Sequence, residues 1–359
     1  MTTSITEHTI GGLRWVVVAG PRLEAFHALG QVARDEIRGV LDGLPERHDL
    51  ERFAATPQGR TALDRVAVAT ATAHPTEYGE LQALATGAGV DFDTMLLLNL
   101  RGDLGADDGT GCSDLGWQRE RSFIAHNEDG APALQGRFML VALAVDGDVP
   151  VTVQWYAGFL PSNTFAVTGH GLVWGIDHVQ VGTPAAAPGR HFIARGLQQA
   201  RSLDAALRYL STHPSAGGFA YTIGELASRR VVTVEAAAGR VAIVEADPLL
   251  WHTNHLRYLD GGVDGGGESL ARGRLLDSVA LPATEPTPDW FLDLLTSPGV
   301  YRNAHDGDPL MTLCSTAVDL TSAEVTLQPR DGPRVTLPLA DLADAPGTPP
   351  PRASRPRDP

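Results

Sequence analysis

The feature that most constrains the fold is an abrupt change of pattern at Cys112. Before this residue, apolar side chains recur at helical spacing, and after it short apolar runs alternate with Gly, Asp and Asn. Helices are predicted over 21–41, 51–73, 75–85 and 93–100, the last with Asp93 as its N-cap. Helical and strand patterns that are segregated in this way indicate a layered α+β architecture.

The strand-like segments are short and are separated by turn residues. One strand is expected at 13–18 after a polar tail, and a strand pair directly follows Cys112. Further strands are predicted at 138–145, 151–156, 165–167, 172–176, 219–223, 230–236, 241–245, 311–319 and 324–327. Helices are predicted between them at 190–200, 202–210 with Ser202 as N-cap, and 289–295. This spacing favours antiparallel hairpins.

The chain divides into three parts by composition. Residues 1–111 are predicted to form a helical N-terminal part, and 112–343 a strand-rich part of the same domain. Residues 344–359 are rich in Pro and Arg and almost free of large apolar side chains, so a disordered tail is expected. The Gly-rich stretch 260–267 is expected to be a flexible loop.

Charge and composition exclude several classes of function. The net charge of −15 argues against partners such as nucleic acid or an anionic membrane. All 28 basic residues are Arg, which excludes a P-loop lysine, a lysine Schiff base and a Ser–Lys dyad. The first residues lack the features of a signal peptide, and no apolar run reaches membrane-spanning length. A cytoplasmic location is expected.

Cys112 is the strongest candidate for chemistry. A thiol becomes a nucleophile once a base takes its proton. Cleavage of the chain before Cys112 would create an α-amino group beside the thiol, and this amine has a pKa near ~7.7–8.0. Gly111 fits a strained cleavage site because it has no Cβ. The alternative is that Cys112 is a small buried hydrophobe, as expected for Cys314, the second cysteine.

Four segments together resemble the acyl-coenzyme A:6-aminopenicillanate acyltransferase-like family of self-processing N-terminal nucleophile hydrolases. The first segment, 80–101, is similar to the family's Gly-rich helix end and the L-N-x-R sequence that follows it. The other three are short motifs in the same order as in the family: Gly111-Cys112-Ser113, Asn127-Glu128-Asp129 and Thr253-Asn254-His255. Each motif is weak alone, but their joint order and spacing are specific.

The resemblance implies a four-layer αββα sandwich with antiparallel sheets, and cleavage between Gly111 and Cys112. It implies that Cys112 is the nucleophile, with its own α-amine as base, and that Asp129 holds that amine. Asn254 would help to form the oxyanion hole, which needs a neutral donor. Substrate-binding candidates are Asn127 and, on a strand that bears Thr and Ser, Thr312 and Ser315. No cofactor is implied.

Two features limit the resemblance. The segment 167–172 and Asp177 replace a family pattern that has a later Asn, so no named substrate can be transferred. His126 and Glu128 could also be considered metal ligands together with Asp129. However, strand alternation sends the first two to one face and Asp129 to the other, so a shared metal is not expected.

The sequence therefore predicts a self-cleaving N-terminal-Cys amidohydrolase or acyltransferase. Its partners would be a small amide, peptide or acyl-CoA substrate and its own cleaved N-terminal fragment. Two alternatives remain open at this point. One is an uncleaved, non-catalytic relative that binds a small amide or peptide, and the other is a thiol enzyme that uses a separate His as base.

Overall fold

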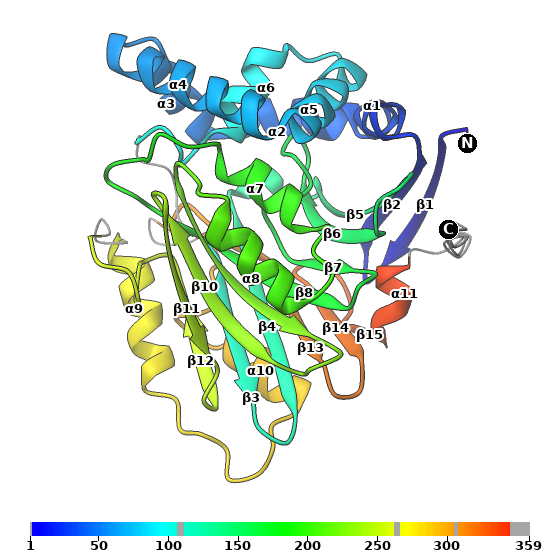
Figure 1. Ribbon diagram of the computed structural model, residues 1–359. Helices are drawn as coiled ribbons and strands as arrows, with labels where there is room; N and C mark the ends of the chain where they lie inside the picture. The colour runs from blue at the N-terminus through cyan, green and yellow to red at the C-terminus, as the bar shows by residue number, and fades with distance from the viewer. Residues whose placement is uncertain (1, 106–110, 262–265, 305–307, 345–359) are drawn as a thin grey trace, which may run out of the picture.

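The fold consists of two sheets that lie face to face, with helices on the outer face of each (Figure 1). The computed structural model describes residues 2–105, 111–261, 266–304 and 308–344. The predicted disordered tail therefore lies outside the described residues except for Asp344, as does the middle of the predicted loop at 260–267.

The larger sheet has nine strands within the described ranges, in the order β1-β2-β5-β6-β7-β8-β9-β10-β11. All neighbours pair antiparallel except β2 and β5, which are parallel. Parallel neighbours need a long connection, and here the N-terminal helices lie between the two strands in the chain. The bounds are β1 Ser4–Ile10, β2 Leu13–Gly20, β5 Phe138–Val145, β6 Val151–Tyr156, β7 Ala166–Thr168, β8 Leu172–Val179, β9 Gly218–Glu225, β10 Val231–Ala237 and β11 Arg240–Glu245.

The smaller sheet has six strands in the described part of the chain, in the order β12-β3-β4-β13-β14-β15, and every pair is antiparallel. Its two central strands are the second strand of the pair that follows Cys112 and the long strand near the C-terminus. The bounds are β3 Ser113–Gln118, β4 Ser122–Gly130, β12 Leu249–His252, β13 Met311–Asp319, β14 Glu324–Pro329 and β15 Val335–Pro338.

The described helices fall into two groups, apart from α11, which contacts strands of both sheets. Those that precede β3, together with α7 and α8, lie on the side of the larger sheet, and α9 and α10 pack on the smaller one (Figure 1). Their bounds are α1 Arg22–Val32, α2 Arg34–Gly43, α3 Pro45–Ala54, α4 Pro57–Ala73, α5 Pro75–Ala88, α6 Phe92–Asn99, α7 Arg190–Leu197, α8 Leu203–Thr212, α9 Gly266–Asp277, α10 Pro288–Leu295 and α11 Leu339–Ala343, with a short 3-10 turn at Pro132–Leu134.

Alternation along the strands creates the layers. In β2, Val16 and Val18 belong to the core between the larger sheet and its helices, and Trp15 and Val17 belong to the core between the two sheets. A third core joins the smaller sheet to α10 through Phe123 and Phe291. Three apolar layers separate four layers of structure, so the predicted α+β class and αββα order are confirmed.

Several predicted elements differ in detail. The helix predicted over 21–41 is two helices, because Ala33 leaves the helical conformation at φ −105° and ψ 20°. The N-cap of α6 is Asp91, whose carboxylate accepts from Thr94 N at 3.0 Å, and not Asp93. Ser202 caps α8 as predicted, accepting from Ala205 N at 3.2 Å.

Other elements were missed by sequence reasoning for physical reasons. β1 was taken for a polar tail because it is the edge strand of the larger sheet and most of its side chains are exposed. α9 begins within the Gly-rich stretch that was predicted to be a loop. The short elements β12, β15 and α11 were also not predicted. Among the described helices, none is both long and apolar enough to cross a membrane.

Candidate active site

Cys112 lies immediately before β3 and is 7% exposed. Its φ is 84°, a left-handed conformation that costs a non-Gly residue about 1–3 kcal/mol. At Gly111, an added Cβ would lie 2.7 Å from the carbonyl oxygen of Asp129, so only glycine fits there. The Gly111–Cys112 junction is therefore both strained and closely packed.

Asp129 holds the backbone nitrogen of Cys112. The Cys112 N–H donates to Asp129 Oδ2 at 3.1 Å, and the hydroxyl of Thr312 donates to the other oxygen, Oδ1, at 2.7 Å. Thr312 pairs with Asp129 across β13 and β4, next to a β-bulge. Both oxygens of the carboxylate are thus engaged. The position of Thr312 makes it a support for Asp129, although the sequence had suggested substrate binding.

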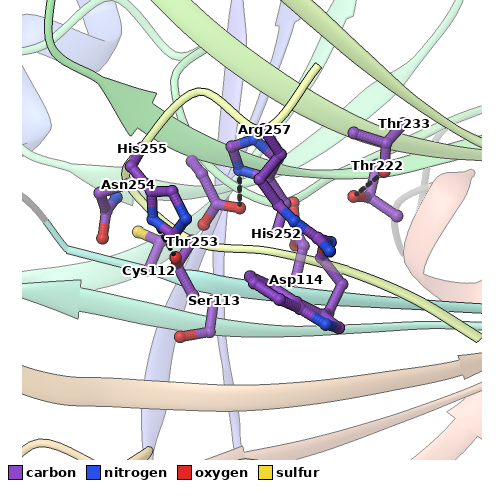
Figure 2. A network of polar contacts seen from close by, with 12 residues as sticks. Cys112, Ser113, Asp114, Thr222, Thr233, His252, Thr253, Asn254, His255 and Arg257 are labelled. Atoms are coloured by element: carbon purple, nitrogen blue, oxygen red, sulfur yellow. Dashed lines mark hydrogen bonds and ion pairs between the residues drawn. The ribbon is translucent and has the colours of Figure 1, made fainter. Parts of the chain in front are cut away.

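Asn254 contacts the carbonyl of Gly111 on the other side of the junction. Its Nδ2 donates to that carbonyl oxygen and, at 3.0 Å, to the carbonyl oxygen of His178. Figure 2 shows Asn254 beside Cys112, on the segment that follows β12 and also carries Thr253 and His255. The amide of Asn254 therefore faces the one carbonyl that cleavage before Cys112 would attack.

Arg272 orients the Asn254 amide and was missed by sequence reasoning. This buried side chain on α9 donates from NH2 to Asn254 Oδ1 at 2.6 Å, which turns the Nδ2 of the amide toward Gly111. Its NH1 donates to the carbonyl oxygen of Cys112 and, at 2.7 Å, to Ser113 Oγ. The signal that could have revealed it was a helical pattern after the Gly-rich stretch.

Glu128 and His126 form a buried group behind the thiol. Cys112 Sγ lies 3.5 Å from Glu128 Oε1, and the hydroxyl of Tyr156 donates to the same oxygen. The other carboxylate oxygen lies 2.9 Å from His126 Nε2, and His126 Nδ1 lies 2.7 Å from Asp114 Oδ1. All of these side chains are almost completely buried, and alternation places His126 and Glu128 on one face, as predicted.

These contacts determine the protonation states of the Cys112 thiol and the His126 ring. Burial, and next the charge of Glu128, raise the pKa of the Cys112 thiol well above its usual range, so the thiol is neutral. Burial alone would oppose a charge on His126, but the carboxylate of Asp114 and the bonds to Cys112 and Glu128 raise its pKa well above normal. His126 is therefore an imidazolium that donates at both nitrogens.

A second histidine is held in the same way deeper between the sheets. His252 Nδ1 lies 3.2 Å from Asp177 Oδ2, and its Nε2 lies 3.0 Å from Glu235 Oε1. Burial opposes its charge, but the two carboxylates raise the pKa of His252 to about 9. Burial, and then the charge of Asp114, also raise the pKa of Asp177. The interior thus contains two carboxylate–imidazolium–carboxylate groups side by side.

Some of these buried side chains are also of the types that bind metal ions. Two groups bring ligand atoms within 4.8 Å of one another, Cys112 with His126 and Glu128, and His126 with Asp114 and Asp177. Both depend on His126. The ring nitrogens of His126 already contact the carboxylates of Asp114 and Glu128, so a metal could bind His126 only after the ring lost a proton.

Two predicted binding residues lie away from the thiol. The amide of Asn127 donates from Nδ2 to the carbonyl oxygen of Leu295 in α10 at 2.8 Å, and Ser315 donates to Asn127 Oδ1 at 2.6 Å. Alternation along β4 points Asn127 toward α10, opposite to the face that carries Glu128. In this structure Asn127 and Ser315 attach α10 to the sheet, and a substrate-binding role for them stays a prediction.

A small cavity of about 40 Å³ adjoins Cys112. Glu128, Tyr156 and Asn163 line it, and so do Glu46 and Arg101 from the helical part of the chain. The aromatic side chains that reach this cavity include Tyr156, whereas Trp155, Phe159 and Trp174 are buried in the core. Apolar side chains, among them Leu134, Ile176 and Phe219, also line the cavity, so its wall is mixed in character.

Gly175→Ala is expected to lower the melting temperature sharply. Gly175 on β8 faces the Asp114–His126 pair across the gap between the sheets, and an added Cβ would overlap Asp114 Oδ1 and approach His126 Nδ1. Forcing these buried groups apart should cost about 1–3 kcal/mol or more. The control is Gly79→Ala, where the nearest atom is 3.6 Å away and helix propensity favours alanine. Equal melting curves for the two variants would contradict this prediction.

The model of one known protein family matches a segment of the chain. Residues 117–279 match the model of a family described as acyl-coenzyme A:6-aminopenicillanic acid acyl-transferase. The predicted resemblance to this family is confirmed over the matched segment, which is a little less than half of the chain. The matched segment contains the Asn127-Glu128-Asp129 and Thr253-Asn254-His255 motifs, and it begins after the Gly111–Cys112 junction.

A curated relative of the chain is the β-alanyl-dopamine/carcinine hydrolase of Drosophila melanogaster. The two are 27% identical over 176 residues, which are 43% of this chain and 46% of the relative. The match thus spans about half the length of that relative.

Two solved structures are also similar. A variant of the conjugated bile acid hydrolase from Clostridium perfringens aligns with a TM-score of 0.44 at 8% identity, over 64% of this chain and 93% of that one. Penicillin V acylase from Agrobacterium tumefaciens aligns with a TM-score of 0.40 at 11% identity, over 65% of this chain and 88% of that one. These scores are too low to bear on fold or chemistry, which rest on the layers and contacts described above.

Proposed function

We propose that the chain cleaves itself between Gly111 and Cys112 and then breaks C–N amide bonds through a thioester on Cys112. The observation that carries this proposal is the hydrogen bond from Asn254 Nδ2 to the carbonyl oxygen of Gly111. That oxygen becomes negatively charged when a thiol attacks the peptide bond, and a donor already aimed at it stabilises the charge. The left-handed conformation of Cys112 adds strain that cleavage releases.

After cleavage, the same groups serve a substrate. The backbone nitrogen of Cys112 becomes an α-amine that can accept the thiol proton, and Asp129 stays bonded to that nitrogen. Removal of Gly111 frees Asn254 Nδ2 to bind the carbonyl oxygen of a substrate amide in the same place. Attack by the thiolate gives an acyl-enzyme, which water or an acceptor amine then resolves. The Gly111–Cys112 peptide bond thus lies where the amide bond of a substrate is proposed to bind.

The substrate class follows from the family and from the relative. The names of both refer to acyl transfer or hydrolysis, with substrates that are an acyl-coenzyme A and a β-alanyl amide. A small amide, peptide or acyl thioester is therefore the proposed substrate. The cavity beside the thiol is small, which favours a short acyl group. The cleaved fragment 1–111 is proposed to remain bound, because its helices cover one layer of the core.

Intact mass spectrometry of the purified protein tests the proposal. The expected result is two fragments, 1–111 and 112–359, that elute together under native conditions and separate in denaturant. A free N-terminal Cys112 should be found by sequencing the larger fragment. A single full-length chain with an unmodified Gly111–Cys112 bond would overturn the proposal in favour of a non-catalytic binding protein.

A further inference from the structure

We infer that Glu128 is the base that removes the thiol proton in the self-cleavage step. This inference rests on the proposed self-cleavage and concerns only the step before an α-amine exists. In the uncleaved chain the nitrogen of Cys112 belongs to a peptide bond, and its N–H donates to Asp129. An amide nitrogen cannot accept a proton, so cleavage needs another base.

The geometry selects Glu128 from the neighbouring groups. Its Oε1 lies 3.5 Å from Cys112 Sγ. The Asp129 carboxylate instead accepts from the Cys112 N–H and from Thr312, and the printed contact of Asp129 with Sγ is made by its backbone carbonyl oxygen, at 3.9 Å. His126 donates to carboxylates at both nitrogens and so has no lone pair for a proton. Glu128 is thus the described neighbour whose carboxylate contacts the thiol directly, and a carboxylate oxygen can take up the proton.

The surroundings hold Glu128 in place for this step. The Tyr156 hydroxyl donates to Oε1, and Phe165 N donates to Oε2 at 3.4 Å. His126 is itself fixed by Asp114, so the carboxylate cannot turn away from the thiol. The hydrogen bond to His126 also lowers the pKa of the Cys112 thiol, partly offsetting burial and the charge of Glu128. These contacts leave the proton a short path from sulfur to oxygen.

The step balances without any additional reactant except water. The thiol proton moves from Sγ to Glu128 Oε1, and Sγ forms a bond to the carbonyl carbon of Gly111. The carbonyl oxygen takes the negative charge and keeps the hydrogen bond from Asn254. As the C–N bond breaks, Glu128 returns the proton to the nitrogen of Cys112. Water then hydrolyses the thioester, which yields the Gly111 carboxylate and the free thiol.

The test compares Glu128→Gln with a matched control, Glu235→Gln. Glu235 is equally buried and bonds His252 as Glu128 bonds His126, but no described contact links it to Cys112. Each full-length chain is produced by cell-free translation, and the appearance of fragment 112–359 is followed with time. We expect cleavage of Glu128→Gln to be slower by about 10²–10⁴, the usual contribution of a general base. The control should cleave within a few-fold of the wild type.

Two further measurements separate a base from a structural support. In Glu128→Gln, hydroxide must remove the thiol proton, so its cleavage rate should rise about tenfold per pH unit, more steeply than in the wild type. Glu128→Asp keeps the charge but withdraws the carboxylate, so it should fold and cleave at an intermediate rate. It also provides the test if the Gln variant does not fold.

The outcomes distinguish this inference from the proposed function. A wild type that never cleaves overturns the proposed function. A wild type that cleaves, with Glu128→Gln or Glu128→Asp equally fast, overturns only the role of Glu128. Equal slowing in Glu128→Gln and Glu235→Gln overturns it as well, because any buried carboxylate–histidine pair would then matter. Slow cleavage confined to the Glu128 variants supports the inference.

Discussion

Cys112→Ala is expected to remain a single chain and to have no amide-cleaving activity. The variant removes the atom that attacks Gly111, and without cleavage no α-amine forms. It should still fold, because Cys112 contributes only a small side chain and is not part of any of the three cores. The checks are the intact mass and a melting curve. Normal cleavage in this variant would remove Cys112 from the mechanism.

Cys112→Ser is the companion variant. A hydroxyl can attack the same carbonyl but is much harder to deprotonate than a thiol, so cleavage should be slow and turnover poor. Fragments that accumulate over hours or days, with little activity per cleaved molecule, would fit this expectation. Wild-type rates of both cleavage and turnover would show that the sulfur atom itself is unimportant.

Asn254→Ala is expected to lower kcat by roughly 10²–10³, the cost of one lost oxyanion donor. KM should change little, because the hydrogen bond strengthens only as charge develops on the substrate oxygen. Self-cleavage should slow as well, since the same amide faces the Gly111 carbonyl. The rate must therefore be expressed per mole of free N-terminal Cys112. Unchanged kcat in a folded, fully cleaved variant would exclude Asn254.

Asn127→Ala is the matched control for Asn254→Ala. It also removes a buried amide, but one that bonds the carbonyl of Leu295 at the end of α10 and accepts from Ser315. Loss of these bonds should cost about 1–3 kcal/mol of stability and leave kcat per cleaved molecule unchanged. A fall in kcat as large as that of Asn254→Ala would mean that burial, rather than position, explains both effects.

The sequence alone was sufficient for the parts of the protein that depend on local pattern. Helical spacing before Cys112 and short apolar runs after it predicted the α+β class, and most strand bounds agree within a few residues. Gly111, Cys112, Asp129 and Asn254 were identified from short motifs, and the structure brings all four together. Local periodicity and motif order are properties of neighbouring residues, so they can be seen without coordinates.

Tertiary structure decided everything that depends on which element covers which face. Arg272 became part of the site only because α9 packs beside the Asn254 segment, and a Gly-rich start concealed that helix. Asn127 contacts α10, which covers its face of β4, while Glu128, one residue later, faces the thiol. Strand alternation divides side chains between two faces, but only packing between distant segments determines which face contains the chemistry.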